Sequence, residues 1–363
     1  MIKLTDEQRA IVFLDSFEKL EYKRKIDILR LFQSPKELFV GAERLENAFL
    51  NIDGGNFIRP VTAALKRREY IDEMIASSLK FCDGIITLYD EEYPEELKNT
   101  PAPPLVLYYR GNVNLLKGKA KRTAIVGSRK TLPLYLEQTR QVAEKLSAAG
   151  EIIVTGIADG ADSAAIKGAL KSGNLISVFA GGLDCVYPRS QVNLAEEIAA
   201  KGLVITEYPA ARPPMKYTYP VRNRIIAGLS RACLIVSGEH GGGARYTASY
   251  AADYGRDVMA FPYGIGAVSG ELCNSLIRQG AALVETADDV ADLLGITVGA
   301  TEKPELDGNE KTVYETLLSG VVNADKIIEN TGLKPYEVNV ALSLLELKKL
   351  IVRSGTDYDI IKK

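Results

Sequence analysis

The feature that most constrains the fold of this chain is a regular alternation of short apolar runs and amphipathic helices across residues 81–298. Continuous apolar strands alternating with helices indicate a parallel sheet that helices cover on both faces. The pattern therefore predicts an α/β, doubly wound core, whose ligands bind beyond the carboxyl ends of the strands. The predicted strands are 123–127, 152–156, 175–180, 203–206, 232–237 and 257–261, and the predicted helices are 134–149, 161–171, 193–201, 223–229, 246–254 and 272–279.

Two smaller regions flank the core, which we take as residues 81–298. Residues 1–80 carry apolar side chains at helical spacing and predict an N-terminal helical domain. Residues 299–309 form a polar linker, and residues 310–363 predict three short helices and a β-hairpin, as in a small winged helix. That module usually binds DNA. Its expected recognition helix, 335–350, has basic side chains only at its end, which favours a protein contact.

Composition limits the class of protein. A chain of 363 residues is long enough for two or three domains, and a net charge of −2 argues against a general nucleic-acid coat. Any anion site must then come from local clustering. No signal core and no membrane-length apolar run occur, so we expect a cytoplasmic protein without membrane contact. Four widely spaced cysteines predict reduced, mostly buried thiols rather than a disulfide frame or a zinc site: Cys82, Cys185, Cys233 and Cys273.

Basic residues cluster in the segment 213–228. This segment interleaves cations with flat aromatic rings and then continues into an apolar helix. No Asp or Glu occurs in residues 208–238. Cations beside aromatic rings suit a flexible polyanion with free bases, which points to single-stranded nucleic acid. The alternative is a solvated loop whose arginines pair with acids elsewhere in the fold. The side chains concerned are Lys216, Tyr217, Tyr219, Arg222 and Arg224.

Four predicted strands end in turns rich in glycine, serine or threonine. Glycine lets the backbone approach a ligand closely, and a following helix aims free N–H groups at a phosphate. Four such turns at one sheet edge predict an extended anion-binding platform. None of them matches an ATPase P-loop or the dinucleotide fingerprint, so we expect no nucleotide cofactor. The turns are 127–129, 155–162, 180–182 and 238–243.

Four charged residues near these turns allow two interpretations each. Arg129 could bind a phosphate or pair with an acid such as Asp162. Asp159 and Asp162 could cap the helix that starts near residue 161, which we prefer to a metal role. Glu207 could act as a base or orient the arginines of the next loop, and we prefer the second role. Because the one histidine, His240, lies in a glycine-rich loop, we expect no catalytic residue.

These motifs together resemble the DNA-processing protein A (DprA/Smf) family. The ordered matches cover about residues 85–290, and the Arg-Asn-Arg helix start is the most specific of them. The matching segments are 93–97, 104–112, 124–129, 155–162, 181–188, 206–209, 219–229, 247–248, 255–258 and 273–281.

The resemblance implies a non-enzymatic protein with an extended Rossmann-like core that binds single-stranded DNA, without a cofactor or a metal. Such proteins protect incoming strands and load the RecA recombinase in natural transformation, and we expect a homodimer. The chain departs from the family pattern at Asp159, where arginine is usual, and at Tyr219, where phenylalanine is usual. Motif and resemblance together predict these DNA contacts: Gly127, Ser128, Arg129, Gly156, Gly160, Gly181, Gly182, Lys216, Tyr219, Arg222, Asn223, Arg224, Gly242, Gly243 and Thr247.

An enzyme is the rival hypothesis. The fold also suits a nucleotide-binding or nucleotide-hydrolysing protein related to the lysine-decarboxylase-like phosphoribohydrolases. Those enzymes use a Gly-Gly-x-Gly-Thr-x-x-Glu loop, and residues 242–247 lack its final Gly-Thr-x-x-Glu part. The sequence therefore offers no replacement for their catalytic acid.

Overall fold

The structure of the chain is a computed structural model. The chain folds into two compact units. Unit 1 comprises residues 1–120 and 176–229, and unit 2 comprises residues 121–175 and 230–363. Most of the predicted linker, residues 300–304 and 307, lies outside the described residues. The described residues are 3–52, 55–118, 121–299, 305–306 and 308–361.

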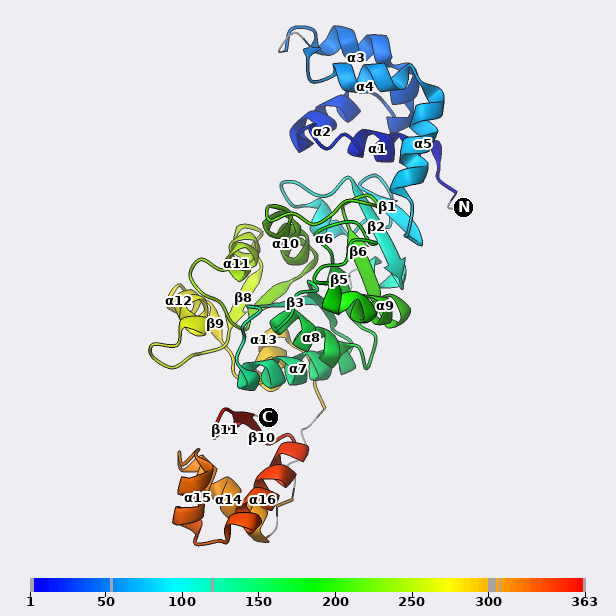
Figure 1. Ribbon diagram of the computed structural model, residues 1–363. Coiled ribbons are helices and arrows are strands. Elements are labelled where there is room, and N and C mark those ends of the chain that lie inside the picture. Colours follow the sequence, from blue (N-terminus) through cyan, green and yellow to red (C-terminus); the bar gives the residue numbers. More distant parts are fainter. Residues whose placement is uncertain (1–2, 53–54, 119–120, 300–304, 307, 362–363) are drawn as a thin grey trace. The chain divides into compact units, whose positions relative to one another are not determined.

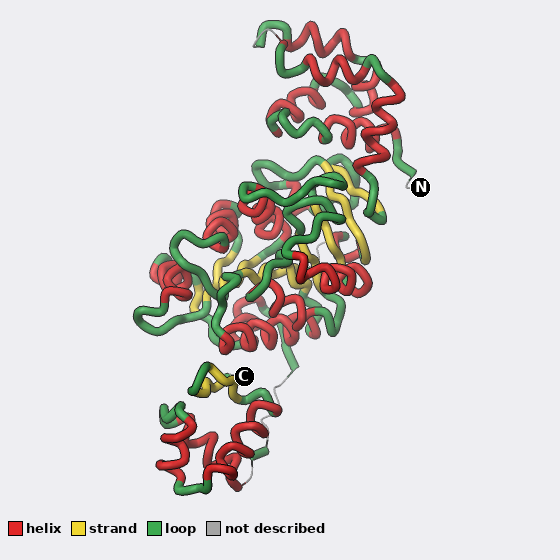
Figure 2. Tube along the Cα trace, viewed as in Figure 1, coloured by secondary structure: helices red, strands yellow, loops and turns green. Residues whose placement is uncertain are grey.

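Unit 1 begins with helices joined by loops, drawn in blue in Figure 1 and as red tubes in Figure 2. The first helix starts at a capping box, in which the side chains of Thr5 and Gln8 each accept the other's backbone N–H. Its residues 10–14 are buried and form the centre of the helical core. The elements are α1 (Asp6–Asp15), α2 (Tyr22–Arg30), the 3₁₀ helix η1 (Pro35–Val40), α3 (Ala42–Phe49), α4 (Arg59–Leu65) and α5 (Arg68–Ser78).

The rest of unit 1 is a four-stranded part of the core with the order β1-β2-β6-β5. β5 and β6 are parallel, as predicted, but β1 pairs with β2 and β2 with β6 in antiparallel fashion. The sequence pattern missed these two antiparallel strands, which precede the first βα repeat. The elements are β1 (Gly84–Thr87), α6 (Glu95–Lys98), β2 (Val106–Gly111), η3 (Val113–Leu116), β5 (Leu175–Val178), η4 (Arg189–Gln191), α9 (Val192–Lys201), β6 (Leu203–Thr206) and α10 (Thr218–Leu229).

Unit 2 contains a wholly parallel part of the core with the strand order β4-β3-β7-β8-β9. Every side chain of β3, β4 and β7 is buried, as expected for strands covered on both faces. The elements are β3 (Arg122–Val126), α7 (Pro133–Ala148), β4 (Ile152–Thr155), α8 (Ala161–Ala169), β7 (Ala232–Ile235), α11 (Ala244–Asp253), β8 (Asp257–Ala260), η5 (Val268–Gly270), α12 (Glu271–Arg278), β9 (Ala282–Leu283) and α13 (Ala287–Leu294).

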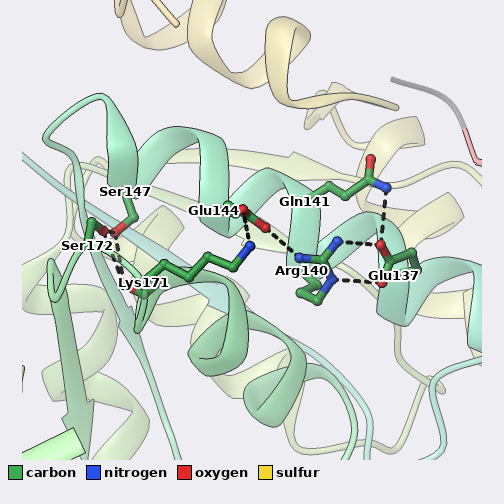
Figure 3. Close-up of polar contacts among 8 residues, drawn as sticks. Glu137, Arg140, Gln141, Glu144, Ser147, Lys171 and Ser172 are labelled. Carbon is green, nitrogen blue, oxygen red and sulfur yellow. Dashed lines mark hydrogen bonds and ion pairs between the residues drawn. The ribbon is translucent and has the colours of Figure 1, made fainter. Parts of the chain in front are cut away.

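Helices α7 and α8 of unit 2 pack closely against each other. A Cβ atom on Gly168 would lie 2.3 Å from the carbonyl oxygen of Arg140, so only glycine permits this approach. Ion pairs on the same helices add a surface network, in which Glu144 joins Arg140 to Lys171 and Arg140 also pairs with Glu137 at 2.5 Å (Figure 3). This packing joins the C-terminal half of α8 to α7.

The C-terminal part of unit 2 has the predicted winged-helix order of three helices and a hairpin. Its core is one cluster of buried apolar residues that includes Val313, Ile327 and Leu345. The prediction of an α/β Rossmann-like core with helices before it and a winged-helix region after it is therefore confirmed. The elements are α14 (Gly308–Leu318), α15 (Ala324–Thr331), α16 (Pro335–Leu347), β10 (Ile351–Ser354) and β11 (Asp357–Ile360).

No helix among the described parts of the chain has both the length and the apolar character needed to cross a membrane.

Candidate nucleic-acid interface

Unit 2 has a topological switch point between β3 and β7. β3 has β4, the next strand along the chain, on one side and β7, a much later strand, on the other. The chain therefore winds away from β3 in two directions, and ligands of such sheets bind at the carboxyl ends of the strands at this point. The turn 127–129 follows β3, and the loop 236–243 follows β7. Two of the four predicted glycine-rich turns thus flank the switch point.

The turn after β3 is fixed by hydroxyl groups. Ser237 Oγ accepts a hydrogen bond from the backbone N–H of Ser128 at 2.9 Å. Thr131 Oγ1 donates to the carbonyl oxygen of Ser128 at 2.8 Å and lies 2.5 Å from Ser237 Oγ. Arg129, next to Ser128, is exposed. A rigid turn therefore carries an exposed guanidinium group at the ligand edge of the sheet.

Gly160 allows the turns after β3 and β4 to pack together. Its φ is +80°, and a Cβ atom there would lie 2.5 Å from the carbonyl oxygen of Ser128. The backbone N–H of Ala161 donates to the same oxygen at 3.2 Å. Gly127 has a similar part, since its Cβ would lie 2.6 Å from Val236 Cγ2. These two glycines are required by the packing of the protein itself, whereas the sequence pattern suggested a close approach of ligand.

The start of α8 differs from the predicted capping arrangement. Its N-cap residue is Gly160, which has no side chain to cap with. Asp162 is buried, and its Oδ2 accepts the backbone N–H of Ala158 at 3.1 Å. Asp162 thus ties down the loop before the helix. Asp159, one of the departures from the family pattern, is exposed at the same turn.

The loop after β7 leads into α11 with an open glycine segment. A Cβ atom on Gly243 would meet no atom within 4 Å, and one on Gly242 would lie 3.1 Å from the carbonyl oxygen of Glu239. Thr247 is different, because it is fully buried on α11. The loop glycines can face a ligand in this arrangement, and the Thr247 side chain cannot.

The glycine-rich turn of unit 1, after β5, supports the basic loop. The backbone N–H of Gly182 donates to the carbonyl oxygen of Arg212 at 2.8 Å. Cβ atoms would lie 2.8 Å from that oxygen at Gly181 and 2.6 Å from the carbonyl oxygen of Pro209 at Gly182. Only glycine therefore lets the loop 209–217 lie against this turn. We call residues 209–217 the basic–aromatic loop.

The basic–aromatic loop runs directly into α10. Thr218 begins the helix, and its hydroxyl donates to the carbonyl oxygen of Met215 at 2.8 Å. Lys216 is exposed, and Tyr217 is 58% exposed. Tyr219, in the first turn of α10, is only half-buried. The end of the loop and the first turn of α10 thus carry one exposed cation, Lys216, and two tyrosines with accessible surface.

The two arginines of α10 have inward contacts. Arg222 is 5% exposed, and its guanidinium donates to the carbonyl oxygen of Val178 and, at 3.1 Å, to Asn223 Oδ1. Arg224 forms an ion pair with Glu207, in which both side chains are mostly buried. The prediction that Glu207 orients an arginine of the next loop is confirmed for Arg224. Burial raises the pKa of the Glu207 carboxyl, although the charge of Arg224 acts to lower it.

Neither Arg212 nor Asp184 was singled out from the sequence, and Tyr217 was not assigned a DNA contact. Tyr217, Arg212 and Asp184 all support or belong to the basic–aromatic loop. The motif of cations and aromatic rings contained Tyr217, but its greater exposure depends on where α10 begins. Asp184 follows Gly182 by two residues, and an Asp in a turn commonly accepts backbone N–H bonds.

Neither the cysteines nor other side chains suggest metal binding. Within the described ranges, no group of three His, Cys, Asp or Glu side chains comes together in a way that could hold an ion. Cys233 and Cys273 are buried, which agrees with the predicted buried thiols, whereas Cys82 and Cys185 are half-buried. All four are free thiols.

Comparison with known proteins places the chain in a family. The family model described as "DNA recombination-mediator protein A" matches residues 84–295, and the model of the DprA winged helix domain matches residues 297–355. The Smf protein of Synechocystis is 37% identical over 213 residues, which are 58% of this chain and 54% of that protein. The DNA processing protein DprA of Bacillus subtilis is 33% identical over 210 residues, 58% of this chain and 70% of that protein. The chain thus spans about half of the first relative.

Two solved structures share the fold. The crystal structure of DprA from Streptococcus pneumoniae has a TM-score of 0.64 and 28% identity, and covers 82% of this chain and 99% of that one. DprA from Helicobacter pylori, in a structure concerned with its single-stranded DNA binding mode, has a TM-score of 0.53 and 28% identity. That match covers 58% of this chain and 95% of the other. The match of the family model to more than half of the chain shows that this protein belongs to the DNA recombination-mediator protein A (DprA) family.

Proposed function

We propose that this chain is a single-stranded DNA-binding protein that uses two sets of groups. The first is the turn 127–129 with the glycine loop 241–243 at the switch point of unit 2. The second is the basic–aromatic loop of unit 1. The observation that carries the proposal is the surface of that loop, where Lys216 and Tyr217 are exposed within a stretch of 31 residues, 208–238, that has no acid. A cation beside an accessible ring suits a strand whose bases are free to stack.

The predicted residues take unequal parts in this proposal. Arg129 and Lys216 neutralise phosphates, and Tyr219 stacks a base. The glycine loop 241–243 lets a strand approach its backbone closely, because a Cβ atom at Gly241 or Gly243 would meet no atom within 4 Å. For the other predicted contacts, burial or close contacts within the protein favour support of the surrounding loops over direct DNA contact. These are Gly127, Ser128, Gly156, Gly160, Gly181, Gly182, Arg222, Asn223, Arg224 and Thr247.

The wider role rests on the family. The protein protects single strands and passes them to the RecA recombinase, acts as a homodimer, and has no enzymatic step. The division into a helical domain (1–80), a DNA-binding core (81–298), a linker (299–309) and a winged-helix-like domain (310–363) belongs to the same proposal. Sedimentation of the purified protein tests the dimer, and formation of RecA filaments on coated single strands tests the loading step.

The test of DNA binding uses fluorescence anisotropy with labelled oligothymidines of increasing length. We expect affinity to rise with length and to fall linearly with salt on a double-logarithmic plot. Lys216→Ala and Arg129→Ala should each reduce that slope by about 0.7, the value for one phosphate contact on a single strand. A thermal-shift comparison of nucleotides with oligothymidine tests the rival enzyme hypothesis.

Matched controls come from the opposite edge of the core. Lys121 precedes β3, whereas Arg129 follows it, and both are exposed. Lys117 follows η3, the short helix after the end of β2 that pairs with the start of β6, and it is exposed as well. Lys121→Ala and Lys117→Ala should leave the slope unchanged. Equal effects of control and site variants would overturn the site, and absence of binding at low salt would overturn the function.

A further inference from the structure

Arg212 connects the N-terminal helices of unit 1 to the basic–aromatic loop. Its Nη1 lies 2.5 Å from Oε2 of Glu18, a residue between α1 and α2. Its Nη2 donates to the phenol oxygen of Tyr217 at 2.8 Å. One planar guanidinium thus holds a carboxylate on one side and a tyrosine on the other. The three side chains form a chain of contacts from the N-terminal region to the residue that precedes α10.

The guanidinium is enclosed and the ring is accessible. The Arg212 side chain is 25% exposed, and its Nε is buried without an acceptor among the described residues. Tyr217 is 58% exposed although its hydroxyl is bound. The cation therefore has its Nη groups engaged within the protein, while the aromatic surface remains open. This arrangement suits a supporting cation and a contacting ring.

The backbone on either side of Arg212 is also held. The N–H of Ala211 donates to both carboxylate oxygens of Asp184, at 3.0 and 3.1 Å. The carbonyl oxygen of Arg212 accepts from Gly182, as described above. Pro213 and Pro214 follow and restrict the chain further. Arg212 thus extends from a fixed backbone, so its two Nη contacts are set by the fold.

We propose that Tyr217 is a second base-stacking residue of the single-stranded DNA site, and that Arg212 and Glu18 are positioning residues that hold its ring. The inference rests on the proposed function of the basic–aromatic loop. It adds a ring that exposes more surface than the half-buried Tyr219. It also gives the N-terminal helices a part in DNA binding, through the geometry of a loop that they contact.

The physical reason is preorganisation. A free tyrosine samples several rotamers, and only the fraction in the binding-competent one can accept a base without a conformational penalty. A hydrogen bond from a charged donor to the phenol raises that fraction before DNA arrives. Loss of any one of the three partners should therefore reduce affinity without removing a phosphate contact.

Two measurements on the 363-residue chain separate the stacking role of Tyr217 from the positioning role of Arg212 and Glu18. Anisotropy with oligothymidine gives affinity and its salt slope, and an oligonucleotide with 2-aminopurine reports stacking by fluorescence quenching. Tyr217→Ala should weaken binding about 5- to 100-fold and remove quenching at one position. Tyr217→Phe, which retains the ring, should weaken binding about 2- to 10-fold, as for one lost hydrogen bond. Glu18→Gln should match Tyr217→Phe, and the double variant should add little.

Arg212→Lys distinguishes positioning from direct phosphate contact. Lysine retains the charge but lacks the fork that reaches two partners. We expect it to weaken binding as Tyr217→Phe does, with an unchanged salt slope. Preserved affinity in Arg212→Lys together with a reduced slope in Arg212→Ala would show a phosphate contact and overturn the inference. The control Tyr89→Ala removes a tyrosine of 49% exposure elsewhere in unit 1 and should change neither readout.

Failure of this inference is distinct from failure of the proposed function. If wild-type protein binds and Lys216→Ala weakens it, but Tyr217→Ala leaves affinity and quenching unchanged, the stacking role is wrong and the binding function stands. If Tyr217→Ala weakens binding but Glu18→Gln does not, the positioning chain is wrong. Thermal melting of each variant shows whether a lost affinity reflects unfolding, and Tyr217→Phe provides a variant with minimal structural change.

Discussion

Arg224 and Glu207 form a mostly buried ion pair that joins the first turns of α10 to the end of β6. Arg224 Nη2 donates to Glu207 Oε2, and within the described chain no donor reaches Oε1. A half-satisfied carboxylate in a buried position is costly to ionise, and its pKa is accordingly raised. The ion pair connects α10, the helix that follows the basic–aromatic loop, to the end of β6. Protonation of Glu207 would weaken this connection.

The first prediction concerns the pH dependence of stability. Because burial raises the pKa of Glu207 in the folded state above the usual value of about 4.3, the folded chain binds its proton more tightly than the unfolded chain does. The free energy of unfolding should therefore fall as pH rises from that value to the raised pKa. Glu207→Gln cannot titrate and should flatten this part of the curve, measured by urea denaturation between pH 4 and 8.

Removing the side chain has a different expected effect. Glu207→Ala leaves the buried guanidinium of Arg224 without its carboxylate and should cost about 3 kcal/mol. Glu197→Gln, on the exposed face of α9, is the control and should leave the pH curve unchanged. An unaltered slope in Glu207→Gln would show that other groups account for the pH dependence.

The second prediction concerns the hydroxyl that fixes the turn after β3. Ser237→Ala removes the acceptor of the Ser128 N–H and one partner of Thr131, and should cost about 1–2 kcal/mol. The turn that carries Arg129 would be less rigid, so oligothymidine affinity should also fall, by less than in Arg129→Ala. Chemical denaturation and anisotropy measure the two effects.

Ser319→Ala provides the control for this experiment, because its exposed hydroxyl donates to the carbonyl oxygen of Thr316 in the winged-helix region. It should change stability by less than about 0.5 kcal/mol, as for an ordinary surface substitution. A stable Ser237→Ala protein with full DNA affinity would contradict the role of Ser237 in the turn.

The parallel core could be predicted from sequence because its signal is local. Each strand of the repeat is a short apolar run with a helix after it, and the predicted strand starts differ from the observed ones by at most one residue. Helix 223–229 was predicted five residues too short, since Pro220 in its first turn was interpreted as part of the loop. β1 and β2 were missed because their antiparallel pairing depends on contacts with each other and with β6.

The geometry of the site was less accessible from sequence. Glycine at 160 and 182 was interpreted as space for a ligand, but close approach of another segment of the same chain explains both. Arginine at 222 was interpreted as a surface cation, yet it is buried against a carbonyl oxygen. Sequence gives residue type and spacing, whereas exposure depends on which neighbour occupies the adjacent space. The expected exposure of Lys216, which lies between two prolines and a helix, agrees with the structure.

The third prediction concerns the four thiols. Burial raises the pKa of Cys82 to about 11 and the pKa values of Cys233 and Cys273 to about 12, and it also raises the pKa of Cys185. Little thiolate is present at pH 7.5, so labelling by a disulfide reagent should be slow in the folded protein. Half-buried Cys185 should react before buried Cys233 and Cys273.

The check is mass spectrometry of the labelled peptides after timed reaction with the disulfide reagent, with denatured protein as the reference in which all four thiols react. Labelling of Cys82 should continue to accelerate up to about pH 11, since its thiolate fraction still grows there. Rapid labelling of Cys233 at neutral pH would contradict its burial within β7.

The last prediction separates two costs of replacing glycine. Gly160 and Gly150 both have positive φ, +80° and +89°, so alanine is strained at either position. A Cβ at Gly150 would meet nothing within 4 Å, whereas one at Gly160 would lie 2.5 Å from the carbonyl oxygen of Ser128. Gly150→Ala should therefore reduce the free energy of unfolding by about 1–2 kcal/mol from backbone strain alone.

Gly160→Ala must in addition displace the turn that carries Arg129. It should therefore reduce stability more and weaken oligothymidine binding, while Gly150→Ala should leave binding intact. Urea denaturation measures the two stability losses. Equal losses, together with wild-type binding by Gly160→Ala, would contradict the prediction, because they would show that the turn at Ser128 moves aside without a measurable free-energy cost.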